Sequence, residues 1–332
     1  MTNFYKNKKI LVAGGTGFIG INLIKKLCDL GAYVKATYFK GKRYVHRDNL
    51  TYLQANLTDF NQCLKATEEI DYVFMLAANT SGAAVIEKDP LAHLTPNVVM
   101  NSYMLAASYQ NNVKKFCFIS SNTVYPVTDY PVRETDVNYK FFSKYHIVGW
   151  MKLFSEEMCN MYSEKISNPM KTLIVRPANL YGPFDKYTYK ESKVIAALIR
   201  RAIEKDDPFL VWGDGMDLKE FLYIDDFINC LINIFKNDEK GPINISANDP
   251  ISIREIIEEI LEAADYKDAN VKFDKSKPTM IPKRLINNDK MIKIYPTFRA
   301  TPISLGIKTT IDWYKVFYKN QTPEEEKNND NN

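Results

Sequence analysis

The chain turns through Gly14-Gly15-Thr16-Gly17-Phe18-Ile19-Gly20 close to its start. An apolar run, Lys9–Ala13, precedes this turn and predicts a buried strand, and a helical pattern follows it over residues 18–27. Glycine permits a tight turn and a close approach of the backbone to a pyrophosphate, and the N-terminus of the helix offers free N–H groups to the anion. The order of strand, glycine turn and helix is the context that this motif requires. We therefore predict a dinucleotide-binding βαβ unit.

Strand and helix patterns alternate through the rest of the first half. Strands are predicted at 33–39, 51–57, 72–78, 115–121 and 172–176, and helices at 59–68, 91–109 and 143–163. Alternation of this kind favours an α/β fold with a doubly wound, parallel Rossmann sheet.

The second half is more mixed, and we expect a smaller α/β lobe there. A helix is predicted at 192–205, and Ser252-Ile-Arg-Glu255 is a capping box that opens another helix through about residue 264. We predict a Rossmann domain over 1–178 with returns from the C-terminal half, a second lobe over 179–320, and a disordered polar tail over 321–332.

Composition excludes several classes of protein. The 332 residues are 45% hydrophobic and carry a net charge of +4, which argues against a collagen-like, disordered or strongly basic nucleic-acid-binding chain. The apolar stretch 72–78 is far shorter than the roughly 20 residues that span a membrane, and no signal-peptide pattern opens the chain. Five scattered cysteines and three histidines predict core thiols in a reducing cytoplasm and no metal site. We expect neither a nucleic-acid nor a membrane partner.

The end of the second strand bears on the choice of cofactor. An NAD site places Asp or Glu there to hold the ribose 2′-hydroxyl. This strand ends with Ala36-Thr37-Tyr38-Phe39-Lys40-Gly41-Lys42-Arg43, which holds no acid and three cations. The pattern suits a 2′-phosphate, so NADP is favoured over NAD, with Tyr38, Lys40 and Arg43 as contacts. A solvated basic loop is the alternative.

Several motifs occur in a fixed order along the chain. They are Gly14 to Gly20, Leu76-Ala77-Ala78, Ser120-Ser121-Asn122-Thr123-Val124-Tyr125, Arg176-Pro177-Ala178-Asn179-Leu180-Tyr181-Gly182-Pro183 and Phe221-Leu-Tyr-Ile-Asp225-Asp226. Together they resemble the extended short-chain dehydrogenase/reductases, which include nucleotide-sugar epimerases, dehydratases and reductases. The resemblance covers about residues 8–316. It implies a Rossmann domain, a lobe that binds a nucleoside diphosphate sugar, and a homodimer formed through the helices around 91–110 and 143–163.

The resemblance also assigns binding residues. For the cofactor it implies Gly14, Thr16, Gly17, Phe18, Ile19, Asn56, Leu57, Leu76, Ala77, Ala78, Lys152 and Pro177. For the sugar nucleotide it implies Ser81, Asn122, Asn179, Val194, Trp212, Lys219 and Arg284. A diphosphate needs cations and N–H donors, which gives Lys219 and Arg284 a physical reason.

The sequence departs from the family at its catalytic dyad, Tyr-x-x-x-Lys on a helix. Lys152 fits the lysine, but the tyrosine position is Val148, and valine cannot carry a proton. Three interpretations stay open. The chain binds without redox chemistry, or another group such as Tyr145 replaces the phenol, or Lys152 itself moves the proton, because burial depresses a lysine pKa and leaves a neutral amine that can act as a base.

The candidate catalytic segment departs in a second way. Ser121 matches the serine that bonds the reacting sugar hydroxyl, and with Thr123 it would polarise the C4 oxygen. Typical 4,6-dehydratases place an acid in the next two positions, where this chain has Asn122 and Thr123. Glu134, in a nearby predicted loop, is a candidate carboxylate, and a solvated loop acid is the alternative.

More local runs resemble one branch of the family, the GDP-N-acetylglucosamine 4,6-dehydratases of legionaminic acid biosynthesis. These runs are Ser81-Gly-Ala-Ala-Val85, Asp89-Pro-Leu-Ala-His93-Leu-Thr-Pro96-Asn97, Val148-Gly-Trp-Met-Lys152, Ser276-Lys-Pro-Thr-Met-Ile-Pro282 and Arg284. The resemblance implies a lyase in which tightly held NADP takes a hydride from C4 of a GDP-sugar and returns it to C6 after water leaves. A 4-epimerase, a 4-ketoreductase and a non-catalytic sugar-nucleotide or NADP-binding protein remain alternatives.

Overall fold

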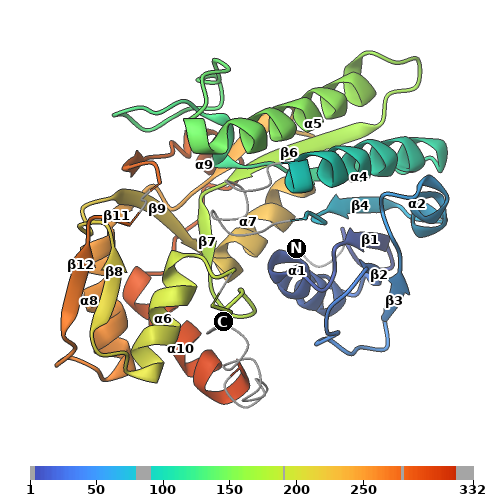
Figure 1. Ribbon diagram of the computed structural model, residues 1–332. Coiled ribbons are helices and arrows are strands. Elements are labelled where there is room, and N and C mark those ends of the chain that lie inside the picture. The colour runs from blue at the N-terminus through green and yellow to red at the C-terminus, as the bar shows by residue number, and fades with distance from the viewer. Residues whose placement is uncertain (1–3, 80–90, 190, 278–279, 319–332) are drawn as a thin grey trace.

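The central element of the molecule is a seven-stranded parallel sheet (Figure 1). The structure is a computed structural model that describes residues 4–79, 91–189, 191–277 and 280–318. In spatial order the strands are β10 (Pro242–Ile245), β6 (Lys171–Pro177), β5 (Lys115–Ile119), β4 (Tyr72–Met75), β1 (Lys9–Ala13), β2 (Tyr33–Tyr38) and β3 (Leu50–Gln54). This confirms the predicted α/β class and the doubly wound sheet.

Helices cover both faces of this sheet. On one face lie α2 (Phe60–Thr67), α4 (Leu91–Gln110) and α5 (His146–Glu164), and on the other lie α1 (Phe18–Asp29) and α7 (Ile224–Phe235). Alternate residues of β1 serve the two cores, because Ile10 and Val12 pack into one and Leu11 and Ala13 into the other. The chain reverses direction across the sheet between β1 and β4, so their carboxyl ends border the crevice where such folds bind ligands.

A second lobe holds smaller sheets. Strands β11 (Pro250–Ser252), β9 (Leu218–Tyr223) and β13 (Lys283–Arg284) form one sheet, β7 (Asn179–Tyr181) pairs with β9, and β8 (Phe209–Trp212) pairs with β12 (Val271–Asp274). The helices here are α6 (Val194–Glu204), α8 (Ile253–Ala264), α9 (Asp289–Ile294) and α10 (Ile303–Trp313), followed by the π-helical turn η3 (Tyr314–Tyr318). The capping box of Ser252 and Glu255 is confirmed at the start of α8.

The predicted elements are present with shifted ends. The strand predicted over 72–78 stops at Met75, because residues 76–78 leave the sheet at its carboxyl edge. The helix predicted from 143 begins as a 3₁₀ turn, η2 (Ser143–Tyr145), and the loop predicted after Ser121 contains another, η1 (Asn122–Val124). Strand β10 returns from the C-terminal half to pair with β6. The tail predicted over 321–332 lies outside the described residues.

Two further predictions concern cysteines and membranes. All five cysteines are buried and free, as expected for core thiols. Among the described residues, no helix has both the length and the apolar character needed to cross a bilayer.

Candidate functional site

The glycine turn between β1 and α1 is shaped by two close backbone approaches. Gly14 has φ of +87°, and a Cβ on it would lie 2.7 Å from the Cα of Ala77 at the end of β4. A Cβ on Gly20 would collide with the carbonyl oxygen of Gly14. The first and third glycines therefore hold the turn against the sheet and the helix against the turn.

Gly17 plays a different part in the same turn. It is the N-cap of α1, makes no side-chain cap, and a Cβ on it would meet only the Gly14 oxygen, at 3.4 Å, among the described atoms. Apart from that oxygen, no described atom crowds the backbone of Gly17 at the N-terminus of α1. A pyrophosphate can approach the backbone N–H groups there, so the residues fit a dinucleotide.

The basic loop after β2 contacts this turn. The Thr16 hydroxyl donates to the carbonyl oxygen of Lys40 at 3.2 Å, and a Cβ on Gly41 would contact the same hydroxyl at 3.4 Å. The Arg43 guanidinium lies 5.3 Å from the centre of the Tyr38 ring, and both Lys40 and Arg43 are exposed. The predicted 2′-phosphate contacts are therefore gathered beside the phosphate turn.

The other predicted cofactor residues line the same edge of the sheet. The Asn56 side chain accepts from the Thr58 hydroxyl at 2.8 Å, which fixes the turn after β3, and Leu57 beside it is buried. Leu76 bonds to the Ala13 oxygen at 3.0 Å, so Ala77 and Ala78 follow directly at the carboxyl end of β4.

Lys152 is a predicted site residue whose pKa departs strongly from its usual value. Its Nζ donates to the carbonyl oxygen of Ile119 at 2.8 Å and lies 4.9 Å from the ring centre of Phe118. Burial lowers the pKa of Lys152 to about 8, and the Glu156 carboxylate opposes this shift. Val148 stands one helical turn before it on α5, so no phenol shares its face of the helix at that position.

Tyr145 is the N-cap residue of α5, and the charge of Arg284 acts on its phenol. Burial raises the pKa of the Tyr145 phenol, and the Arg284 charge acts in the opposite direction. Arg284 is itself buried, and its guanidinium donates to the carbonyl oxygens of Pro126 at 2.8 Å and Tyr125 at 3.3 Å. Arg284 thus acts on the charge balance of Tyr145, and among the described interactions no hydrogen bond joins Tyr145 to Arg284 or to Lys152.

The segment from Ser121 to Thr123 forms a compact polar turn. The Ser121 hydroxyl accepts from the backbone N–H of Thr123 at 3.2 Å and from its hydroxyl at 3.0 Å. The Asn122 amide donates to the carbonyl oxygen of Pro177 at 3.1 Å. A predicted substrate residue and a predicted nicotinamide residue are therefore in contact.

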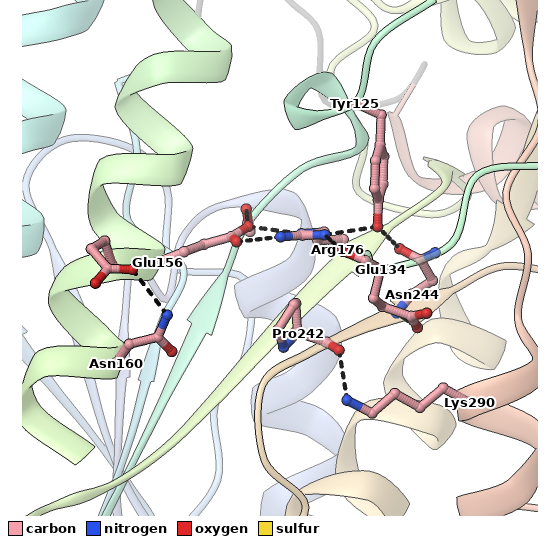
Figure 2. A network of polar contacts seen from close by, with 10 residues as sticks. Tyr125, Glu134, Glu156, Asn160, Arg176, Pro242, Asn244 and Lys290 are labelled. Carbon is pink, nitrogen blue, oxygen red and sulfur yellow. Dashed lines mark hydrogen bonds and ion pairs between the residues drawn. The ribbon is translucent and has the colours of Figure 1, made fainter. Parts of the chain in front are cut away.

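Glu134 is held away from this turn. Its carboxylate accepts from the backbone N–H of Asn244 at 2.8 Å, and its carbonyl oxygen accepts from Arg176 at 2.9 Å. Figure 2 shows it beside Asn244 and Arg176, and no described hydrogen bond joins its side chain to Ser121 or Lys152. Its part in proton transfer stays a prediction that these contacts do not favour.

The predicted substrate residues of the second lobe are partly engaged already. The Asn179 amide donates to the Glu220 carbonyl oxygen at 2.9 Å, and Lys219 pairs with Asp217 at 2.9 Å. Trp212 is 51% exposed at the end of β8, and Val194 is exposed at the start of α6. Ser81 lies outside the described residues.

Sequence reasoning missed a buried polar network behind the site (Figure 2). Glu156 on α5 and Arg176 on β6 are joined by two hydrogen bonds, and Tyr125 and Asn244 extend the network. One signal could have found it, because Glu156 follows Lys152 at helical spacing of four and Arg176 interrupts an apolar strand.

Comparison with known proteins agrees with this geometry. The model of the NAD dependent epimerase/dehydratase family matches residues 10–246. GDP-mannose 3,5-epimerase 1 of Oryza sativa subsp. indica is 30% identical over 265 residues, which cover 77% of this chain and 69% of that protein. GDP-L-fucose synthase of Escherichia coli K12 is 26% identical and covers 92% of this chain and 96% of its own. The crystal structure of a GDP-L-fucose synthetase from Naegleria fowleri bound to NADP superposes with a TM-score of 0.78 at 26% identity, over 95% of this chain and 96% of that one.

Proposed function

Since the chain belongs to the NAD-dependent epimerase/dehydratase family, we propose that it is an NADP-dependent enzyme that modifies a nucleoside diphosphate sugar. Its specific reaction is 4,6-dehydration of a GDP-sugar, with GDP-N-acetylglucosamine as the first candidate. The observation that carries the proposal is Lys152, a desolvated amine that donates to the Ile119 carbonyl oxygen at the end of β5, two residues before Ser121, while Val148 occupies the family's tyrosine position.

The reaction divides between the cofactor and these side chains. The glycine turn with Lys40 and Arg43 would hold NADP⁺, which would supply reversible hydride transfer between C4 and C6 of the sugar. Ser121 and Thr123 donate to the C4 oxygen, and the neutral amine of Lys152 takes the C4 hydroxyl proton as the hydride leaves. The resulting ketone acidifies the C5 proton; removal of that proton and protonation of the C6 hydroxyl release water, and a proton returns to C5 when the hydride adds at C6. The product is a 4-keto-6-deoxy sugar, and the cofactor ends the cycle unchanged.

The partner of Lys152 in proton transfer is the second step of the proposal. Tyr145 is half-buried at the N-terminal end of α5 and faces the charge of Arg284. Burial raises the pKa of this phenol, and the Arg284 charge opposes the rise because a cation stabilises the phenolate. We assign Tyr145 the exchange of a proton with the substrate.

The choice of NADP and of a GDP-sugar has separate support. The loop after β2 carries Lys40 and Arg43, accepts from the Thr16 hydroxyl through the Lys40 carbonyl oxygen, and holds no acid for a ribose hydroxyl. The Naegleria relative is bound to NADP, and the curated relatives named above are GDP-sugar enzymes. The buried free thiols support a reducing compartment, the cytoplasm.

Two kinds of rival function remain, another reaction on the same scaffold and ligand binding without turnover. The names of the relatives favour an epimerase or a 4-ketoreductase on the same scaffold. Val148 favours a protein that binds both ligands without turnover.

The test is product analysis by mass spectrometry with purified protein, NADP⁺ and a panel of nucleotide sugars that includes GDP-N-acetylglucosamine. Loss of one water without accumulation of NADPH is expected. In a parallel assay with NADPH and a 4-keto nucleotide sugar, stoichiometric oxidation of NADPH would identify a reductase instead. An unchanged mass with a new sugar stereoisomer by NMR would identify an epimerase, and no change with any sugar would leave a binding protein.

A further inference from the structure

The buried ion pair behind the site joins two elements that carry candidate residues. Arg176 Nε donates to Glu156 Oε1 at 2.9 Å, and its Nη2 donates to Oε2 at 2.5 Å, while the two side chains are 4% and 6% exposed. A buried pair of this kind contributes little net stability when intact, and breaking it leaves an uncompensated charge. Its value to the molecule therefore depends on what it holds in place.

The pair holds both ends of the candidate catalytic turn. The Ser120 hydroxyl donates to Glu156 Oε1, and Ser120 directly precedes Ser121. At the other end, Arg176 Nη1 donates to the Tyr125 hydroxyl at 2.9 Å, and that hydroxyl donates to Asn244 at 2.6 Å (Figure 2). Residues 121–124 thus lie between Ser120 and Tyr125, whose side chains both bond to the ion pair.

The same pair also fixes the helix that carries Lys152. Lys152 and Glu156 lie one turn apart on α5 and contact consecutive residues of one segment, the Ile119 carbonyl oxygen and the Ser120 hydroxyl. Val148 has no polar group that could link α5 to the Ser121 turn, so the spacing of Ser121 and Lys152 depends on the anchors behind them.

We propose that Glu156 and Arg176 are positioning residues, which set the distance between Ser121 and Lys152 by clamping Ser120, Tyr125 and α5 together. The inference rests on the proposed function, because it takes Ser121 and Lys152 as the groups that meet the sugar. The clamp also has an electrostatic side. Besides Lys152, the titratable groups that interact with Glu156 in the described structure are Arg176, Tyr125 and Cys159.

The first experiment measures turnover in Glu156→Gln, Ser120→Ala and Tyr125→Phe of the full chain loaded with NADP. A misplacement of about 1 Å can cost about 10²-fold in rate, so we expect kcat of Glu156→Gln to fall by about that factor. Each variant that removes one anchor should lower kcat by about tenfold, the effect of one hydrogen bond. The affinity for NADP should change by less than about threefold, because the phosphate turn is not touched.

The matched control is Asp226→Asn. Asp226 is a buried carboxylate on α7 that accepts from the backbone and hydroxyl of Thr301 at 2.7 and 3.0 Å, and no described hydrogen bond links it to the clamp. It should lower the melting temperature without changing kcat. If Ser120→Ala, Tyr125→Phe and Glu156→Gln also lower only the melting temperature, the pair is structural and the proposal is wrong.

A second experiment needs no substrate, so it separates failure of the clamp from failure of the proposed function. Reductive ¹³C-methylation of the lysines followed by NMR titration reports the pKa of Lys152, identified by its absence in Lys152→Arg. Glu156→Gln should lower this pKa, because the charge that opposes desolvation is removed, and Ser120→Ala should leave it closer to the value of the unaltered protein. An unchanged pKa in Glu156→Gln would overturn the coupling, whatever the enzyme turns over.

Discussion

The phosphate turn and the reacting end of the site are built in opposite ways. The turn is local in sequence, and its shape follows from glycines that meet backbone, as Gly14 meets Ala77. The reacting end gathers side chains from β5, α5, β6 and β10, and its shape follows from the buried pair of Glu156 and Arg176. Close backbone contacts leave no room for a side chain at Gly14. A network of side chains, in contrast, can keep its arrangement although Val148 occupies the family's tyrosine position.

The strongest test of this contrast is Lys152→Arg. Arginine keeps the charge and the hydrogen bond to the Ile119 oxygen but cannot release a proton at any usable pH, so kcat should fall by about 10³-fold. NADP affinity should fall far less. If Lys152→Arg retains most of the activity, Lys152 only orients ligands, and Tyr145→Phe should then carry the large loss.

The pH dependence sharpens the same point. Lys152 acts as a base only when neutral, and burial lowers its pKa to about 8. The rate should therefore be low below that value, because the amine is protonated, and rise to a plateau above it. The measurement is kcat against pH for the loaded enzyme. A profile that is flat between about pH 6 and 9 would contradict the assignment, since an ordinary tyrosine or lysine would titrate higher.

At the phosphate turn we expect backbone substitutions to separate stability from binding. Gly17→Ala adds a Cβ that meets only the Gly14 oxygen, at 3.4 Å, among the described atoms, so it should lower NADP affinity by about 10²-fold by obstructing the pyrophosphate and change the melting temperature far less. Gly14→Ala should lower both, because its φ is +87° and its Cβ would press on Ala77. Isothermal titration with NADP and thermal unfolding make the comparison. Equal losses of affinity and stability in both variants would refute the division of labour among the glycines.

These two regions also mark how far sequence reasoning extends. The glycine turn and the order of elements are predictable because each depends on local spacing, whereas Lys152 is assigned through the resemblance to the family's Tyr-x-x-x-Lys motif. The roles of Glu156, Arg176 and Asn244 are not, since residues up to 119 positions apart meet through Tyr125 and Asn244. Arg284 was predicted to bind a diphosphate, and that role stays a prediction. Its guanidinium bonds to the carbonyl oxygens of Tyr125 and Pro126, from a loop whose path periodicity does not predict.

A smaller effect is expected from the basic loop. The double variant Lys40→Ala/Arg43→Ala removes two exposed cations beside Thr16, so NADP affinity should fall by about tenfold to 10²-fold while NAD affinity is retained. Competitive binding of the two cofactors gives the ratio. If both affinities fall equally, or neither changes, the loop does not select the 2′-phosphate.

The smallest effect on chemistry should come from the outer face of α5. Trp150 and Phe154 lie one helical turn apart on that face and are 44% and 49% exposed, a pattern that suits the predicted homodimer helix interface. Phe154→Glu should convert a dimer to a monomer by light scattering, because a carboxylate cannot be buried there without a partner. Tyr33→Glu, at an equally exposed aromatic on β2, is the control and should leave the assembly unchanged. Since Lys152 and Glu156 point from the same helix toward β5, the monomer should keep its kcat within a few fold, and a complete loss of turnover would mean that the outer face of α5 also contributes to the site.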